Sequence, residues 1–233
     1  IGFIRDFREN LGVDVGVGSL GFKENGYLFL AHSQEGAGLL QELAEMQCGL
    51  GAATAVLSPD QIKARFPWLE VGDLAAGSFG NRDEGWFDNM GLLAGFRAAA
   101  KAQGARFVTD EVTGISITAG RVTGVTLGKG GHVACSTAVN AAGTRAATVA
   151  RMAGLDLPVE PRKRTVFVID APNARHPDAP LLVDTGFYLR PEQNHWITAT
   201  VPQDDGPCAV DDFQPDLHLF EDVIWEQLYN RAP

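Results

Sequence analysis

The stretch that decides the fold reads Val139-Asn140-Ala141-Ala142-Gly143-Thr144-Arg145-Ala146. It ends a run of predicted strands and opens a predicted helix, and its central residues are small. Small side chains let a backbone come close to a cofactor, but they also serve simple close packing between a strand and a helix. The turn is therefore a candidate cofactor contact whose meaning depends on the sequence around it.

The residues before this turn change from a helical to a strand period. Apolar residues between 92 and 100 form one helical stripe that Gly104 is placed to end. After Gly104 the period becomes two, which predicts strands joined by short turns at 106–108, 112–117, 121–127 and 132–139. A helix is then expected at 145–153, so the small-residue turn lies between a strand meander and a helix.

The remaining parts of the chain predict further helices and strands. Ser58 is placed to cap a short helix that starts at Pro59, and Gln61 is placed to return the capping bond. The Asn25-Gly26 pair suggests a hairpin between residues 20–23 and a strand at 27–31. The other periodic segments predict helices at 3–11, 35–47 and 217–228, and strands at 165–169, 181–184, 187–190 and 195–200.

The composition is that of a globular protein whose partner is neither nucleic acid nor an anionic membrane. The 233 residues are 45% hydrophobic and carry a formal net charge of −10. Both of those partners require a basic face, and there is no basic cluster beyond Arg162-Lys163-Arg164. No run approaches the roughly 18 apolar residues of a membrane span.

Cysteine and histidine usage excludes a simple metal site and suggests a reducing compartment. The three cysteines, Cys48, Cys135 and Cys208, are irregularly spaced and show no zinc signature. The five histidines never pair at i, i+2 or i, i+4. The expected location is the cytoplasm of a bacterium, or the mitochondrion if the source is a eukaryote.

Four segments taken together resemble one family. They are FDNMGLLAGFRAAAKAQGARFVTDEVTGISI (87–117), VNAAGTRA (139–146), PVEPRKRTVFVIDAP (158–172) and FYLRPEQNHWI (187–197). The set is similar to the amine-oxidising flavoproteins that include D-amino-acid, glycine and sarcosine oxidases and dimethylglycine dehydrogenase. PVEPRKR and FYLRPE most resemble the sarcosine/dimethylglycine branch and a mitochondrial FAD-containing assembly factor of complex I.

The resemblance implies an α/β (α+β) fold in two lobes with a discontinuous chain path. A partial FAD-binding, Rossmann-like lobe would span 88–155. An antiparallel-sheet substrate lobe would combine 20–87 with 156–233, and 1–19 would form a helix and linker at the lobe interface.

The family's N-terminal GxGxxG unit has no counterpart in this sequence. Residues 16–21 spell GxGxxG, but no apolar strand precedes them and no helix follows, so they are interpreted as a loop. The chain is therefore expected to be an internal fragment of an FAD-dependent parent protein. By itself it is expected to lack FAD, to be inactive and to dimerise through exposed apolar surfaces.

The resemblance also assigns cofactor contacts. Val112 matches the position where family members bind the adenine edge through main-chain atoms, although a plain core valine fits equally well. Ala142 and Gly143 would lie against the adenosine side of FAD, with a tight strand-to-helix turn as the alternative. Arg145 departs from the aromatic residue often found at its position.

Tyr188 and Arg190 are the candidate substrate-binding residues. They are two apart on a predicted strand, so their side chains share a face, and a phenol beside a guanidinium suits a substrate carboxylate. The alternative is a solvent-facing pair. Arg162-Lys163-Arg164 is interpreted as a solvated run, because three consecutive charges cannot all point into one site. His195 and Trp196 are interpreted as structural, and no catalytic residue is assigned.

Two functions on the flavoprotein fold remain open at this stage, beside a weaker third interpretation, a self-contained binding domain unrelated to flavin. The first is a fragment of an FAD-dependent oxidoreductase that oxidises the C–N bond of a small amino acid or N-methyl amino acid, such as sarcosine, dimethylglycine or glycine. The second is a non-catalytic assembly or interaction protein built on the same fold.

Overall fold

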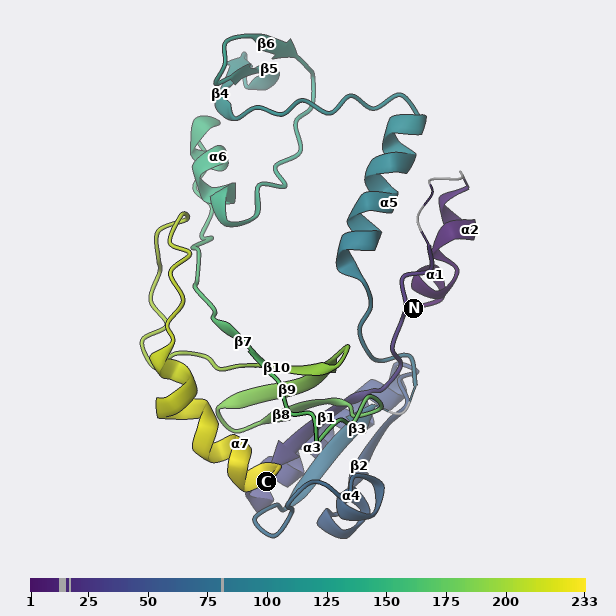
Figure 1. Cartoon of the computed structure of the whole chain (residues 1–233). Helices are drawn as coiled ribbons and strands as arrows, with labels where there is room; N and C mark the ends of the chain where they lie inside the picture. Colours follow the sequence, from purple (N-terminus) through teal and green to yellow (C-terminus); the bar gives the residue numbers. More distant parts are fainter. Residues whose placement is uncertain (13–15, 17, 81) are drawn as a thin grey trace. The chain divides into compact units, whose positions relative to one another are not determined.

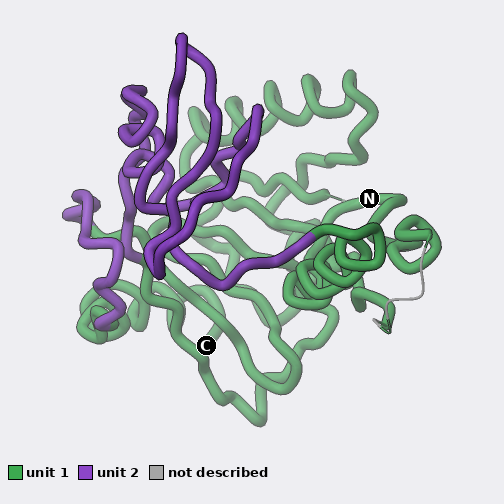
Figure 2. The backbone as a smooth tube through the Cα atoms, turned by 90° about the horizontal axis from the view of Figure 1, so that it is seen from above, with its two compact units in different colours: residues 1–105, 164–202, 215–233 green, residues 106–163, 203–214 purple. Residues whose placement is uncertain are grey.

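The computed structural model describes residues 1–12, 16, 18–80 and 82–233. Its contacts divide the chain into two compact units, which Figure 2 shows in green and purple. The larger unit combines residues 1–105, 164–202 and 215–233, and the smaller unit combines 106–163 and 203–214. Each unit is therefore assembled from segments that are far apart in the sequence, as the discontinuous path predicts.

The larger unit is built on a seven-stranded sheet with the order β2-β3-β1-β8-β9-β10-β7. Its strands are β1 (Tyr27–Ala31), β2 (Thr54–Leu57), β3 (Ala76–Gly80), β7 (Val166–Ile169), β8 (Leu181–Asp184), β9 (Phe187–Glu192) and β10 (His195–Ala199). Neighbouring strands are antiparallel except β1 and β8, which run parallel. The expected antiparallel sheet is thus a mixed one, because the long connection between β1 and β8 permits a parallel pairing that no short turn allows.

Local sequence signals explain where the helices of this unit begin. Ser58 and Gln61 form the predicted capping box at the start of α4 (Pro59–Arg65). The Ser33 and Asp88 side chains accept hydrogen bonds from backbone N–H groups at the starts of α3 (Gln34–Gly49) and α5 (Asn89–Ala102). The other helical segments of the unit are α1 (Gly2–Arg5), α2 (Phe7–Leu11), η2 (Phe220–Ile224, a π-helical segment) and α7 (Trp225–Arg231).

One face of the sheet forms the core of the larger unit. Leu28, Leu182 and Leu189 stand in register on β1, β8 and β9 and are almost completely buried. They pack with side chains of α4 and α7, including Ile62 and Leu228, and Figure 1 shows α7 beside the strands. Burying such aliphatic side chains contributes about 1.5–3 kcal/mol each, so this face anchors the unit.

Three local predictions are wrong. The helix expected at 3–11 is interrupted at Asp6, which separates α1 from α2. Residues 20–23 form no hairpin with β1. Only Lys23 is bridged, and its partner is Trp86, because β3 occupies that side of β1. Residues 106–108 form no strand, and the first strand after α5 begins at Val112.

The smaller unit holds the small-residue turn. Its three-stranded antiparallel sheet has the order β4-β5-β6, with β4 (Val112–Thr118), β5 (Arg121–Leu127) and β6 (His132–Ala134). The turn leads through η1 (Gly143–Arg145) into α6 (Ala146–Met152), which packs against β4. The meander and the helix are confirmed, although the last strand stops at Ala134.

The assignment of 88–155 to an FAD lobe stays a prediction, because contacts alone do not say which residues hold a cofactor. By contacts, α5 belongs to the larger unit. Val17 of the GxGxxG stretch lies outside the described residues, and no helix or strand is formed by residues 18–22. Among the described residues, no helix has the length and apolar character needed to cross a bilayer.

Candidate functional site

The second face of the large sheet carries the candidate site, and we call it the Tyr188 face. Five residues stand in register on five adjacent strands of this face: Phe29, Val183, Tyr188, Ala199 and Val166. Phe29 and Val166 are 41% and 51% exposed, whereas Leu28, which precedes Phe29 and points to the core, is buried. Large apolar side chains are thus presented on an accessible sheet surface.

A cavity of about 490 Å³ lies against this row. Four of the row's residues line it, together with Gly186 of the β8–β9 turn and residues 200–201. Its wall is mostly apolar, and the polar residues that line it are Arg164, Asp184, Tyr188 and Thr200. The strand periodicity of two explains this composition, because the same alternation that buries Phe187 and Leu189 turns Tyr188 to the opposite face.

Tyr188 is half-buried, and burial raises its pKa above the ordinary value of a phenol. The positive charge of Arg190 opposes this shift but does not cancel it. The phenol therefore keeps its proton at neutral pH and can donate a hydrogen bond into the cavity. A protonated phenol in an apolar wall is suited to orient a carboxylate or another acceptor.

Arg190 lies on the same face, one register position further along β9, as the spacing predicts. Its guanidinium does not line the cavity. Nη1 lies 2.5 Å from Oε2 of Glu192, and the guanidinium carbon lies 5.2 Å from the centre of the Trp86 ring. Arg190 is thus held between a carboxylate and an aromatic ring, and Glu192 neutralises its charge.

Arg164 is the residue that sequence reasoning missed. Two members of the basic run make surface ion pairs, because Arg162 contacts Glu160 at 2.9 Å and Lys163 contacts Asp212 at 3.0 Å. Arg164 is also exposed, yet it lines the cavity. The signal was present in the sequence, since Arg164 directly precedes the strand predicted at 165–169, and continuing its alternation would put Arg164 on the same side as Val166.

The three predicted cofactor contacts lie in the smaller unit. Val112 is the first residue of β4 and is in register with Leu127 of β5. Gly143 has a left-handed backbone with φ of +54°, and no atom of its surroundings lies within 4 Å of the position that a side chain would occupy. The space beside Gly143 is therefore open, as the approach of a large planar cofactor requires.

The small-residue turn is held in shape by its asparagine. Nδ2 of Asn140 donates to the carbonyl of Ala146 at 2.8 Å, and Oδ1 accepts from the Ala142 backbone N–H at 3.3 Å. Gly143 lies in η1, which leads directly into α6, and α6 packs on β4, the strand that Val112 begins. The residues fit an adenosine contact, and their role stays a prediction.

The sequence between residues 3 and 233 matches the model of the FAD dependent oxidoreductase family. The chain belongs to this family. The family is FAD-dependent, and the fold with its mixed α/β architecture agrees with that of related flavoenzymes. The resemblance inferred from the four sequence segments is thereby confirmed.

The curated relatives that this chain matches are longer than the chain itself. The chain is 35% identical over 265 residues to FAD-dependent oxidoreductase domain-containing protein 1 of Xenopus laevis, a match that covers 99% of this chain and 53% of that protein. It is 30% identical over 188 residues to the mitochondrial sarcosine dehydrogenase of Mus musculus, covering 75% of this chain and 20% of that protein. The chain thus spans about half the length of the first relative.

Solved structures show the same fold. The L-proline dehydrogenase of P. horikoshii superimposes with a TM-score of 0.78 at 25% identity, covering 99% of this chain and 63% of that one. Glycine oxidase from Geobacillus kaustophilus gives a TM-score of 0.78 at 22% identity, covering 100% and 60% of the two chains.

In the part of this chain that the structure describes, no three His, Cys, Asp or Glu side chains are grouped as metal ligands.

Proposed function

We propose that the protein is an FAD-dependent oxidoreductase that oxidises the C–N bond of a small amino acid or N-methyl amino acid. The observation that carries this proposal is the half-buried Tyr188 phenol in an apolar cavity, with the Arg190 guanidinium one register position away on the same face. The relatives named for sarcosine and glycine supply the substrate class as a hypothesis.

Each part of the cavity then has a role in binding. Tyr188 donates a hydrogen bond to the substrate carboxylate, and Arg190, beside the cavity on the same face, contributes positive charge when that carboxylate displaces Glu192 from the ion pair. The aliphatic residues of the row, Val183, Ala199 and Val166, contact the methyl and methylene groups and exclude water. Bound FAD would supply the acceptor for the hydride that leaves the carbon next to the amine.

Holding the substrate by its carboxylate fixes the orientation of the amine. Tyr188 and Arg190 sit on a strand that has neighbours on both sides, so the grip is on a rigid element. Val112, Ala142 and Gly143 are proposed to hold the adenosine end of FAD. In this proposal the protein residues position the substrate and the cofactor and stabilise charge, and they form no covalent bond with the substrate.

The proposal is tested with the full-length gene product carrying bound flavin. Sarcosine, dimethylglycine and glycine are added in turn without oxygen, and the loss of the oxidised flavin absorbance is followed. We expect at least one of the three to bleach the flavin. Methylamine, which lacks the carboxylate, is the matched control and should bleach it much more slowly.

The same measurement separates the two functions that the sequence left open. A flavin-bound protein that none of these amines reduces would contradict the enzymatic proposal and favour the non-catalytic alternative. Equal rates with methylamine and sarcosine would support an amine oxidoreductase but would contradict the proposal that the substrate is held by its carboxylate.

A further inference from the structure

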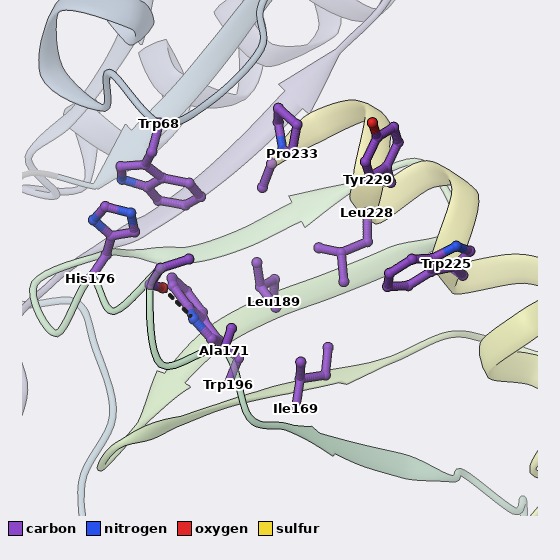
Figure 3. A pocket seen from close by; sticks show the side chains of 12 residues that line it. Trp68, Ile169, Ala171, His176, Leu189, Trp196, Trp225, Leu228, Tyr229 and Pro233 are labelled. Atoms are coloured by element: carbon purple, nitrogen blue, oxygen red, sulfur yellow. Dashed lines mark hydrogen bonds between the residues drawn. The ribbon is translucent and has the colours of Figure 1, made fainter.

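A second cavity, of about 240 Å³, lies on the core side of the large sheet. Leu189 lines it, and its neighbour Tyr188 on β9 points to the opposite face. The cavity is therefore separate from the Tyr188 face. Figure 3 shows its residues around a common space, between the strands and α7.

Aromatic rings form two walls of this cavity. On one wall the rings of Trp68 and His176 are stacked with centroids 4.9 Å apart, and Trp196 lies 5.6 Å from Trp68. On the other, Trp225 and Tyr229 are one helical turn apart on α7, with centroids separated by 6.4 Å. Figure 3 places these two groups on opposite sides of the space, with Leu189 and Leu228 between them.

The chemistry of the lining restricts what can bind. Among the residues that the structure describes, no Asp, Glu, Lys or Arg side chain lines the cavity. An anion would find no Lys or Arg side chain there, and the indole N–H of Trp196 is already used, because it donates to the Ala174 carbonyl at 2.9 Å. Burying unpaired polar groups is costly, so a polar ligand is disfavoured.

We propose that this cavity binds an uncharged, planar aromatic molecule of one or two fused rings. Aromatic rings prefer partners with centroids about 4.5–7 Å apart, in offset or edge-to-face contacts that two facing aromatic walls offer. The size agrees, since an apolar cavity of about 150 Å³ accepts benzene. Trp225 and Tyr229 are 54% and 60% exposed, so a ligand has access to the space between the walls.

The occupant would touch the strand that carries the candidate substrate residues. Leu189 lies between Tyr188 and Arg190 in β9, and its side chain forms part of the floor of the aromatic cavity. The inference does not depend on the proposed function, because the aromatic cavity lies entirely within the larger unit and shares no side chain with the cavity at Tyr188.

Indole is the probe for the test, and binding is measured by ligand-observed saturation-transfer NMR and by calorimetry on the intact protein. We expect a dissociation constant on the order of 1 mM or tighter for a ligand of this size. Trp225→Ala removes one wall and should weaken indole about tenfold. Phe213→Ala removes an 84% exposed aromatic residue elsewhere and is the matched control, with no change expected.

Ala171→Phe is a second variant, because it fills the cavity while the walls remain, and it should also abolish indole binding. The proposal is overturned if indole does not bind, or if folded Trp225→Ala and Ala171→Phe proteins bind it as the wild type does. Tetramethylammonium bound more tightly than indole would overturn the ligand class, because it would make the rings a cation site.

Discussion

The guanidinium of Arg231 and the carboxylate of Asp184 form an ion pair inside the larger unit, with Nε and Oδ2 2.6 Å apart and side-chain exposures of 4% and 5%. The pair joins the C-terminal end of α7 to the end of β8. Arg231 also makes a bidentate contact with Asp73, at 2.8 and 2.9 Å, and donates to the Glu70 carbonyl. A single side chain thus ties α7 to the sheet and to the loop before β3.

Breaking this pair should destabilise the protein strongly. Arg231→Met leaves Asp184 buried without its guanidinium partner, with His32 Nε2 still 2.6 Å from its other oxygen, and removal of one partner of a buried pair costs about 3–5 kcal/mol. The free energy of unfolding in urea measures the effect. Glu70→Gln is the control, because it breaks the exposed Lys63–Glu70 pair, which is worth at most about 1 kcal/mol. Equal losses in the two variants would contradict the structural role of Arg231.

Low pH should weaken the contact between α7 and the loop before β3, because Asp73 becomes protonated. The hydrogen bond from Arg231 holds the pKa of Asp73 below its ordinary value. A carboxyl with a lowered pKa in the folded state contributes stability that is present above the unfolded pKa, near about 3.9, and is lost as pH falls through the folded pKa. We expect the unfolding free energy to fall below about pH 4.

Asp73→Asn tests this assignment. The variant should be less stable than the wild type at pH 7, and the difference should shrink below about pH 4, because the wild type loses the same contact there. Because the Asp73 side chain is 59% exposed, solvent screening keeps the effect modest. An unchanged difference between pH 7 and pH 3 would show that Asp73 does not titrate in this way.

Several predictions that depend only on residues close together in the sequence are confirmed. The capping box at Ser58, the meander at 112–134 and the shared face of Tyr188 and Arg190 follow from residues within a few positions of one another. The same period of two also places Glu192 on that face, where it pairs with Arg190. This neighbour was readable in the sequence and was overlooked.

Contacts between segments that are far apart in the sequence could not be predicted from these local patterns. Arg231 and Asp184 are 47 residues apart, and Trp86 reaches Arg190 from a loop that precedes α5. The parallel pairing of β1 with β8 joins segments about 150 positions apart, and no local period encodes it. Such pairings depend on the whole packed core, which explains why the strand order and the buried ion pair appear only in the structure.

Gly143 should matter for the cofactor more than for stability. Gly143→Ala forces an alanine into a left-handed backbone at a cost of about 1 kcal/mol, and its methyl group occupies the open space beside the turn. We expect a loss of FAD affinity of about tenfold or more, a factor that corresponds to about 1.4 kcal/mol. Fluorescence titration of the full-length protein with FAD measures it.

Gly154→Ala is the matched control for this experiment. Gly154 follows α6 with φ of +74°, and a methyl group added there would also meet no atom within 4 Å. The two variants should therefore lose similar stability, while only Gly143→Ala loses FAD affinity. If both variants bind FAD equally well, the small-residue turn is a packing feature and not a cofactor contact.

Two variants, Arg190→Ala and Glu192→Gln, test whether Arg190 binds the substrate carboxylate. Arg190→Ala should weaken binding of a carboxylated amine by about 1.5–3 kcal/mol, the range for a hydrogen bond to a charged group. Glu192→Gln should leave binding unchanged or tighten it, because it releases Arg190 from the ion pair at 2.5 Å. Binding of methylamine should be the same in both variants, since it has no carboxylate to hold. A loss that is equal for sarcosine and methylamine in Arg190→Ala would remove Arg190 from the site and leave Tyr188 as the candidate that lines the cavity.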